Sequence, residues 1–229
     1  MPATRSCSIP QDGPWRMGRR VASHLAAAGH EVYAVGGCVR DLLLGRPVHD
    51  VDLATAADPD TVERLAADAG FTAVAVGKAF GVIIVVDDGE QVEVATFRSD
   101  GAYIDGRRPT SIHAADAATD VERRDFTINA LLLDLTTATI IDHVGGLEDL
   151  EARRLRTVGD PARRFAEDRL RVLRALRFAA HLDLAVDPAT WAALGGVDLG
   201  GLAQPDRAVT LVGPGPPVGL PGPMAAPPG

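Results

Sequence analysis

The stretch from Tyr33 to Thr55, YAVGGCVRDLLLGRPVHDVDLAT, constrains the fold of this chain more than any other. The apolar run Val32–Val35 predicts a short buried strand that breaks at Gly36-Gly37. The next residues, CVRDLLLG, predict a short helix that ends at Gly45, and the chain then returns as a second strand over Asp50–Ala54. We therefore expect a strand–helix–strand unit around which the rest of the chain is arranged.

This unit carries two groups of residues that together favour phosphate and metal binding. Gly36 and Gly37 let backbone N–H groups approach a ligand at a helix N-terminus, and Arg40 in the first turn can reach the same anion. Residues two apart in a strand share a face, so Asp50 and Asp52 are expected to project side by side. Adjacent carboxylates repel unless a cation lies between them, and Mg²⁺ takes one or two carboxylates together with phosphate oxygens. Either group alone is more often a plain turn or a solvated strand face.

A second candidate region is the segment PARRFAEDRLRVLRALRFAAH, which predicts one helix over residues 161–181. Its expected apolar stripe is Leu170, Leu173, Leu176 and Ala180. Its charged residues recur at intervals of three: Asp168, Arg171, Arg174 and Arg177. One interpretation is an ordinary surface ladder of ion pairs. The other is that Asp168 and Arg171 present an acceptor and a rigid donor fork to the edge of a base.

Other polar residues also have two interpretations each. Arg123-Arg124-Asp125 is either a charge cluster at a helix start or a grip on ribose and triphosphate. Glu93, on a predicted strand, is either a third acid beside Asp50 and Asp52 or an exposed strand residue. His49, His113 and His143 are interpreted as structural or solvent-facing, because no second ligand stands at metal spacing.

The remaining pattern predicts helices and strands in mixed order. Met1–Asp12 is expected to be irregular, and Arg98–Arg123 is poorly periodic, which is typical of a functional or mobile segment. A hairpin turn is expected at Asp87–Glu90. Helices are predicted over 14–28 and 58–69 and near Trp191, and strands over 72–76, 81–86, 91–97 and 139–144.

Composition excludes several classes. The chain has 229 residues, 46% of them hydrophobic, which suffices for one full domain and part of a second. Its net charge of −8 argues against a generally basic nucleic-acid coat. Cys7 and Cys38 are too few for a disulfide framework or a zinc site, so a reducing, cytoplasmic location is expected. No stretch has the length of a membrane span or the character of a signal peptide.

Taken together, these segments resemble the class II tRNA nucleotidyltransferases and bacterial poly(A) polymerases, the family of the CCA-adding enzymes. The matching segments, in the family's order, are GGCVRDLLLGRPVHDVDLAT, GKAFGV, VEVATFRSDGAYIDGRRP, RRDFTINAL, HVGGLEDL and LRTVGDPARRFAEDRLRVLRALRFAA. The resemblance covers most of residues 30–195. It implies an α+β fold: a DNA polymerase β-like nucleotidyltransferase head with a mixed, mostly antiparallel sheet and helices, followed by the start of an α-helical neck.

The resemblance also implies a role for each matching residue. Asp50 and Asp52 would hold catalytic Mg²⁺. To these we add Glu93 as a third catalytic carboxylate, which extends the pattern from its predicted strand. Gly37 and Arg40, beside Gly36, would contact the phosphates of the incoming nucleotide, and Arg124 with Asp125 its sugar or triphosphate. Asp168 and Arg171 would pair with the base of CTP or ATP, and Arg174 and Arg177 would hold the nucleotide from the same helix.

The expected organisation is a head over residues 13–150, a partial neck over 151–200 and a disordered Pro/Gly-rich tail over 201–229. The expected activity is Mg²⁺-dependent, template-independent addition of CMP, AMP or both from CTP and ATP to the 3′ end of tRNA or another RNA, with release of pyrophosphate. The alternatives are a truncated, non-catalytic nucleotide-binding remnant and a poly(A) polymerase. A plain Mg²⁺-dependent nuclease would leave the base-reading helix without a role. The added sequence and the oligomeric state stay open.

Overall fold

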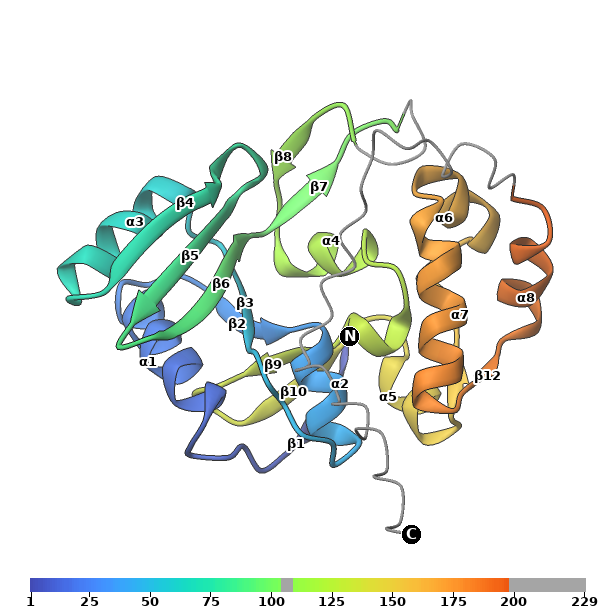
Figure 1. The fold of residues 1–229 in the computed structure, drawn as a ribbon, viewed down its shortest axis with the longest axis horizontal. Coiled ribbons are helices and arrows are strands. Elements are labelled where there is room, and N and C mark those ends of the chain that lie inside the picture. The colour runs from blue at the N-terminus through green and yellow to red at the C-terminus, as the bar shows by residue number, and fades with distance from the viewer. Residues whose placement is uncertain (104–108, 198–229) are drawn as a thin grey trace, which may run out of the picture.

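An eight-stranded mixed sheet forms the centre of the fold (Figure 1). Its strands are β1 (Ala3–Ser6), β2 (Val32–Val35), β3 (Asp52–Thr55), β4 (Thr72–Gly77), β5 (Val82–Asp87), β6 (Glu90–Thr96), β9 (Leu132–Asp134) and β10 (Thr139–Asp142). In the computed structural model, which describes residues 1–103 and 109–197, their order is β1-β10-β9-β2-β3-β6-β5-β4. All neighbouring pairs are antiparallel except β3 and β6, which are parallel. The expected α+β fold with a mostly antiparallel sheet is confirmed.

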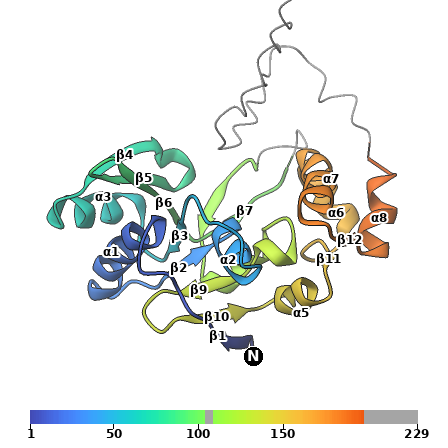
Figure 2. The same cartoon turned by 60° about the horizontal axis from the view of Figure 1, so that its bottom comes forward.

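A group of helices stands beside the sheet, at the opposite end from β4 and β5 (Figures 1 and 2). It comprises α5 (Gly146–Glu151), α6 (Pro161–Glu167), α7 (Leu170–Leu182) and α8 (Pro188–Leu194), with the short parallel pair β11 (Arg154–Leu155) and β12 (Ala185–Val186). The ring of Phe178 on α7 meets Phe126 edge to face at 5.8 Å. The domain boundaries at residues 150 and 200 stay predictions, and the tail expected over 201–229 lies outside the described residues.

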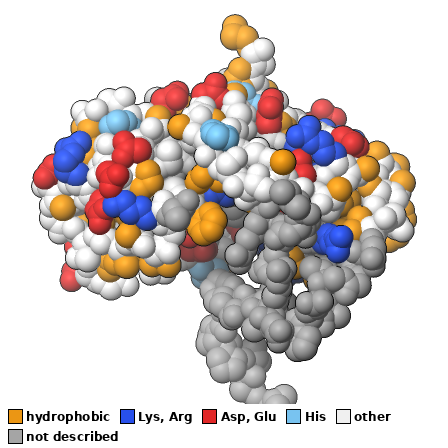
Figure 3. All heavy atoms as spheres, turned by 90° about the horizontal axis from the view of Figure 1, so that it is seen from above, with side chains coloured by type: hydrophobic (Ala, Val, Ile, Leu, Met, Phe, Trp, Pro, Cys, Tyr) orange, Lys and Arg blue, Asp and Glu red, His pale blue; other side chains and the backbone are white. Residues whose placement is uncertain are grey.

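The surface is mixed in charge. Figure 3 shows acidic and basic side chains interspersed with hydrophobic ones over the face that it presents. Within residues 1–103 and 109–197, no helix has both the length and the apolar character to cross a membrane.

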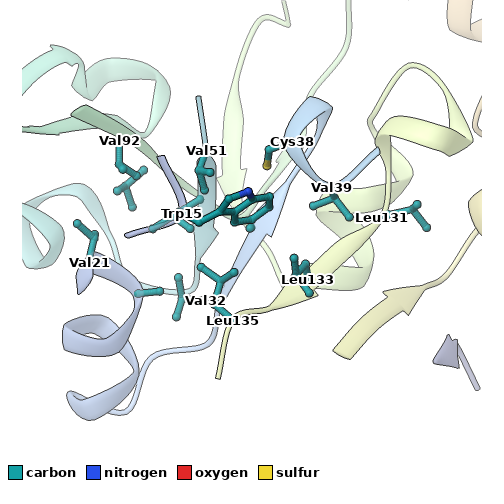
Figure 4. Close-up of a cluster of buried hydrophobic side chains, with 14 of the residues drawn as sticks. Trp15, Val21, Val32, Cys38, Val39, Val51, Val92, Leu131, Leu133 and Leu135 are labelled. Atoms are coloured by element: carbon teal, nitrogen blue, oxygen red, sulfur yellow. The ribbon is translucent and has the colours of Figure 1, made fainter. Parts of the chain in front are cut away.

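One face of the sheet is covered by α1 (Pro14–Ala27) and α3 (Pro59–Asp68), both of which were expected. Their buried side chains meet those of the strands in the main core, part of which is shown in Figure 4. The start of α3 follows its sequence, because the Asp58 carboxylate accepts a hydrogen bond from the Thr61 backbone N–H at 3.0 Å. These helices leave the other face of the sheet for the site.

The opposite face carries a smaller core, to which α4 (Ala117–Glu122) contributes. Side chains alternate along β3, so Leu53 belongs to the main core while Ala54 belongs to the smaller one. Asp52, two residues before Ala54, therefore lies on the face away from α1 and α3. This alternation determines on which side of the sheet the acid lies.

Two expectations of irregular structure are wrong. Ala3–Ser6 forms edge strand β1, in which Ala3 pairs with Asp142 of β10. All four of its side chains are exposed, so no apolar alternation marks the strand in the sequence. Within Arg98–Arg123, β7 (Arg98–Asp100) pairs with β8 (Ile112–Ala114) and α4 follows. These strands are too short to give a period, and residues 104–108 of this segment lie outside the described part.

The hairpin expected at Asp87–Glu90 is confirmed. Asp88 and Gly89 both adopt positive φ, 51° and 80°, which is the geometry of a two-residue hairpin turn between β5 and β6. The hairpin places Glu93 of β6 beside Asp52 of β3 in the parallel register. The parallel pairing of β3 and β6 thus brings two acids to neighbouring positions.

Candidate active site

A cavity of about 1030 Å³ lies where the sheet meets the helices, between α2 (Gly37–Leu43), the residues leading into β3, the segment after α4, and α7. Every predicted site residue except Glu93 lines it: Gly36, Gly37, Arg40, Asp50, Asp52, Arg124, Asp125, Asp168, Arg171, Arg174 and Arg177. These residues come from segments far apart in the sequence. The structure thus brings together what the sequence motifs only suggested separately.

The turn from β2 into α2 forms one wall of the cavity. Gly36 has φ 78° and ψ −136°, a conformation that side chains strongly disfavour, and this explains glycine at that position. A Cβ on Gly36 would lie 4.0 Å from Arg124 Nη1. The turn therefore leaves the backbone open toward the cavity with an arginine close by.

Arg40 is held rigidly in this wall and is only 7% exposed. Its Nε and Nη2 donate to the Asp41 carboxylate at 2.9 and 2.8 Å, and its Nη1 donates to Asn129 Oδ1 at 2.6 Å. Its guanidinium also lies 5.1 Å from the centre of the Phe178 ring. Because these contacts fix the guanidinium group of Arg40, its positive charge stays in the wall of the cavity.

The expectation that Asp50 and Asp52 lie on one strand is wrong. β3 begins at Asp52, and Asp50 lies in the loop before it, exposed. The bounds of the strand were wrong because Val51, although buried, makes no ladder pair with β2. Both carboxylates nevertheless line the same cavity.

The carboxyl of Asp52 has a pKa raised to about 6. Burial is the main cause, followed by the negative charges of Glu93 and Asp50, while the positive charge of Arg124 acts in the opposite direction. Glu93 pairs with Asp52 across β3 and β6, but it is exposed and outside the lining of the cavity. The acids thus repel one another, and a cation placed among them would relieve that repulsion.

Arg123 and Arg124 share one buried anchor. Asp120 on α4 is 1% exposed, and its two oxygens accept from Arg123 Nη2 at 2.8 Å and from Arg124 Nη2 at 2.9 Å. Burial raises the pKa of Asp120, but the charges of Arg124 and Arg123 outweigh burial and leave that pKa below its ordinary value. Arg124 Nε is buried and has no hydrogen-bond partner among residues 1–103 and 109–197. Asp120 therefore fixes the position of the Arg124 guanidinium group, which still has an N–H available for a further hydrogen bond.

Asp125 connects the sheet side of the cavity to α7. Its Oδ2 accepts from Arg174 Nε at 2.7 Å, and its Oδ1 accepts from Asn129 Nδ2 at 3.3 Å. Asn129 in turn accepts from Arg40, so a continuous chain of hydrogen bonds runs from α2 to α7. Both Asp125 and Asn129 are buried. In a site of low dielectric such a chain is strong and resists displacement.

The single helix expected over residues 161–181 is wrong. The chain forms α6 and α7 with a break at Asp168, whose φ of −144° and ψ of 105° are extended. The Asp168 carboxylate accepts from the Leu170 backbone N–H at 2.9 Å, an arrangement that competes with a continuous helix. The break turns Asp168 toward the cavity rather than along a helical ladder.

The expected apolar stripe is also wrong. Leu173 and Leu176 are 46% and 47% exposed, whereas the buried residues of α7 are Arg171, Val172, Ala175, Phe178 and Leu182. Arg171 can be buried because Glu167 Oε2 and the backbone oxygens of Arg164 and Arg123 accept from its guanidinium at 2.9, 3.1 and 3.1 Å. The ion pair between Arg171 and Glu167 of α6 therefore outweighs the apolar spacing in deciding which face of α7 is buried.

Several lining residues were not singled out by sequence reasoning: Asn129, Phe178, Arg46 and His181, together with His49, which was interpreted as structural or solvent-facing. Phe178 has three guanidinium groups, those of Arg40, Arg174 and Arg177, between 5.1 and 5.2 Å from its ring centre. Four of them stand inside the segments that carry the family resemblance: Arg46, His49, Asn129 and Phe178. His181 stands one residue beyond the last of these segments, and only the fold shows that these residues line one cavity.

Comparison with known proteins gives consistent matches. A family described as the poly A polymerase head domain matches residues 32–156. The CCA-adding enzyme of Bacillus pumilus is 49% identical over 164 residues, which are 70% of this chain and 40% of that protein. The solved CCA-adding enzyme of Bacillus stearothermophilus in complex with CTP is 39% identical with a TM-score of 0.70, over 80% of this chain and 43% of that one.

A third match is a solved tRNA nucleotidyltransferase complexed with a primer tRNA and an incoming ATP analogue. It is 33% identical with a TM-score of 0.63, over 77% of this chain and 49% of that one. The chain thus spans less than half the length of each of these relatives.

Proposed function

Because the chain belongs to the poly A polymerase head domain family, we propose that it is a metal-dependent, template-independent nucleotidyltransferase acting on RNA. In this proposal it transfers CMP, AMP or both from CTP and ATP to the 3′ end of tRNA and releases pyrophosphate. The relatives named CCA-adding enzyme, and the solved complexes with CTP or with tRNA and an ATP analogue, support this reading.

The observation that carries the proposal is that one cavity contains all the groups that the reaction needs. Acids that can hold a divalent ion, a glycine turn open to phosphate, and an acceptor–donor pair for a base line a single space of about 1030 Å³. Phosphoryl transfer depends on position and on charge stabilisation, with little covalent chemistry for the protein. A site of this composition suits that requirement.

The acid pair fits Mg²⁺. Asp50 and Asp52 offer carboxylate oxygens, the ligands that Mg²⁺ prefers. The pKa of Asp52 is raised first by burial and then by the negative charges of Glu93 and Asp50, which a cation would offset. Within the described residues no group of three or more His, Cys, Asp or Glu side chains forms a complete metal site. A two-carboxylate site suits Mg²⁺, which usually completes its shell with water and substrate phosphate oxygens.

The residues then have distinct proposed roles. Asp50 and Asp52 hold the metal, and Glu93 adds negative charge behind Asp52. The backbone at Gly36 and Gly37 and the guanidinium of Arg40 bind the triphosphate. Arg124 and Asp125 contact the sugar or triphosphate. Asp168 and Arg171 read the base, while Arg174 and Arg177 support the nucleotide from α7.

The proposed reaction joins the oxygen of the RNA 3′-hydroxyl to the α-phosphorus of the nucleotide. The bond from that phosphorus to the oxygen that bridges to the β-phosphorus breaks, and pyrophosphate leaves while the hydroxyl proton is released. Asp50 and Asp52 would hold Mg²⁺, which would supply positive charge to offset the negative charge of the phosphates. Arg40 and Arg124, whose guanidinium groups are held by Asp41 and Asp120, stabilise the leaving pyrophosphate without reorganising.

The test is nucleotide incorporation by the purified chain. A tRNA that lacks its 3′-terminal CCA is incubated with Mg²⁺ and labelled CTP or ATP, and the products are separated by length. The proposal predicts products longer by one to three nucleotides that disappear when Mg²⁺ is chelated. Binding of CTP and ATP without any longer product would instead identify a nucleotide-binding remnant, and a long homopolymer of A would identify a poly(A) polymerase.

A further inference from the structure

Two arginines in the wall of the cavity differ from the rest. Arg40, Arg123, Arg124, Arg171 and Arg174 each pair with a carboxylate. Among the arginines that line the cavity, only Arg46 and Arg177 lack a carboxylate partner within residues 1–103 and 109–197. An arginine without an acid partner keeps its full charge for an external anion.

Arg46 is instead directed at a histidine. Its Nη2 lies 2.9 Å from His181 Nε2, in the last turn of α7. Arginine can only donate, so His181 Nε2 accepts and the neutral ring carries its proton on Nδ1. A guanidinium paired with a neutral ring is not neutralised. An anion that entered between them would be bound by the arginine and, with the ring proton on Nε2 in place of Nδ1, by that ring N–H.

This pair occupies the end of the cavity away from the proposed base-reading residues. Asp168 precedes α7 and Arg171 lies in its first turn, whereas His181 lies in its last turn, about 15 Å from Arg171 along the helix at about 1.5 Å per residue. Arg46 precedes Asp50 by four residues in the loop that leads to β3, and this loop lines the cavity through Arg46, His49 and Asp50. The pair therefore lies at the other end of α7 from the proposed base-reading residues, and its arginine stands on the loop that leads to the acids.

The chemistry of the proposed reaction requires a second anion there. In an in-line displacement the attacking oxygen and the leaving pyrophosphate lie on opposite sides of the phosphorus. Arg40, Arg124 and the glycine turn are assigned to the pyrophosphate, so the strand that supplies the 3′-hydroxyl has to reach the acids from another side. Such a strand carries a phosphodiester one nucleotide from its end, and contacts to phosphates are what position a nucleic acid on a protein.

We propose that Arg46 and His181 form a subsite for a phosphodiester close to the 3′ end of the acceptor RNA, separate from the site of the nucleotide triphosphate. The guanidinium fork and the ring N–H donate to the two non-bridging oxygens, and the contact between Arg46 and His181 gives way to the ligand. This inference rests on the proposed function, because it assigns the acceptor side of the same reaction.

The test measures RNA and nucleotide binding separately, in the full chain. A 5′-labelled oligoribonucleotide with a free 3′-hydroxyl and, independently, CTP with Mg²⁺ are titrated against wild type, Arg46→Gln, Arg46→Lys and His181→Gln. The matched control is Arg64→Gln, which removes one positive charge from an exposed pair with Asp68 on α3, outside the cavity.

Arg46→Gln is expected to weaken RNA binding about tenfold, the size of a lost charge-assisted hydrogen bond, and to lower the slope of log Kd against log salt by about 0.7. Arg46→Lys keeps the charge and should lose less affinity, and His181→Gln should weaken RNA binding severalfold. The Kd for CTP should change by less than twofold in all of them, which also shows that the variants fold.

The inference is overturned if Arg46→Gln weakens CTP as much as RNA, if it weakens neither, or if Arg64→Gln has the same effect on RNA. Wild type that binds no RNA at low salt would overturn it as well. Failure of the proposed function is a separate observation, namely no nucleotide incorporation by wild type, and RNA binding still decides the subsite in that case.

Discussion

At the scale of single residues, the ionisation state of Asp52 sets the negative charge of the candidate metal site. Its pKa is raised to about 6 by burial and by the charges of Glu93 and Asp50, against about 3.9 in an unfolded chain. Between these values the folded chain keeps a proton that the unfolded chain has lost. The contribution of protonated Asp52 to the free energy of unfolding is therefore fully present below about pH 4. This contribution is lost as the pH rises through about 6.

Removal of this charge should stabilise the metal-free fold at neutral pH. We expect Asp52→Asn to raise the free energy of unfolding by about 1–3 kcal/mol at pH 7.5 and by almost nothing at pH 4. Urea denaturation in the presence of a chelator at both pH values measures the difference. Asp12→Asn, an exposed acid outside the cavity, is the control. An equal gain at both pH values would show that the buried charge of Asp52 is not the cause.

Asn129 is a second residue whose role is decided by its contacts. It is 6% exposed, accepts from Arg40 Nη1 and donates to Asp125, so it positions two residues that are assigned to the nucleotide. Asn129→Ala leaves the buried Arg40 with one partner fewer, and we expect KM for CTP and ATP to rise about tenfold. Steady-state kinetics with both nucleotides test this, and Asn129→Asp, which keeps the acceptor for Arg40, should lose less. Unchanged KM in Asn129→Ala would refute the positioning role.

At the scale of elements, the sequence predicts those that begin and end on local features. The strand Val32–Val35 has the predicted bounds, and α3 and α8 start after the capping acids Asp58 and Asp187, each followed by proline. By contrast, β1 and the β7–β8 pair exist only because a distant strand supplies their hydrogen bonds. No local pattern could predict them.

The helix of the candidate site shows the same limit more sharply. Its residue spacing predicted one helix with a leucine stripe inward, but Glu167 binds Arg171 and turns that arginine inward instead. The polar residues of the site were predictable where they stand in continuous motifs, as Asp50, Asp52 and Arg124 do. Arg46 and His181 are 135 positions apart and could be connected only by the fold.

The orientation of α7 can be tested by stability. Leu176 is exposed, whereas Phe165 on α6 is completely buried in the main core. We expect Leu176→Gln to change the free energy of unfolding by no more than about 0.5 kcal/mol and Phe165→Ala to lower it by about 3–5 kcal/mol. Urea denaturation of both variants at one pH measures the contrast. A large loss in Leu176→Gln would mean that the leucine stripe is the buried face after all.

At the scale of the whole molecule, the cavity belongs to both parts of the chain. The main core is continuous from α1 through the sheet to Phe165, Val172 and Leu182 of the helical part. The acids and the glycine turn come from the sheet side, and the base-reading candidates come from the helical side. An acidic chain with a net charge of −8 can therefore still present a cavity lined with arginines.

We propose that Asp52 holds the metal for nucleotide transfer in this cavity. The most direct measurement is the rate of labelled CMP or AMP incorporation into tRNA lacking its 3′ end, compared among wild type, Asp52→Asn and the control Asp12→Asn under saturating Mg²⁺. We predict that wild type and Asp12→Asn extend the RNA at similar rates, whereas Asp52→Asn gives no detectable product although it folds. Full activity in Asp52→Asn would contradict the assignment of the site.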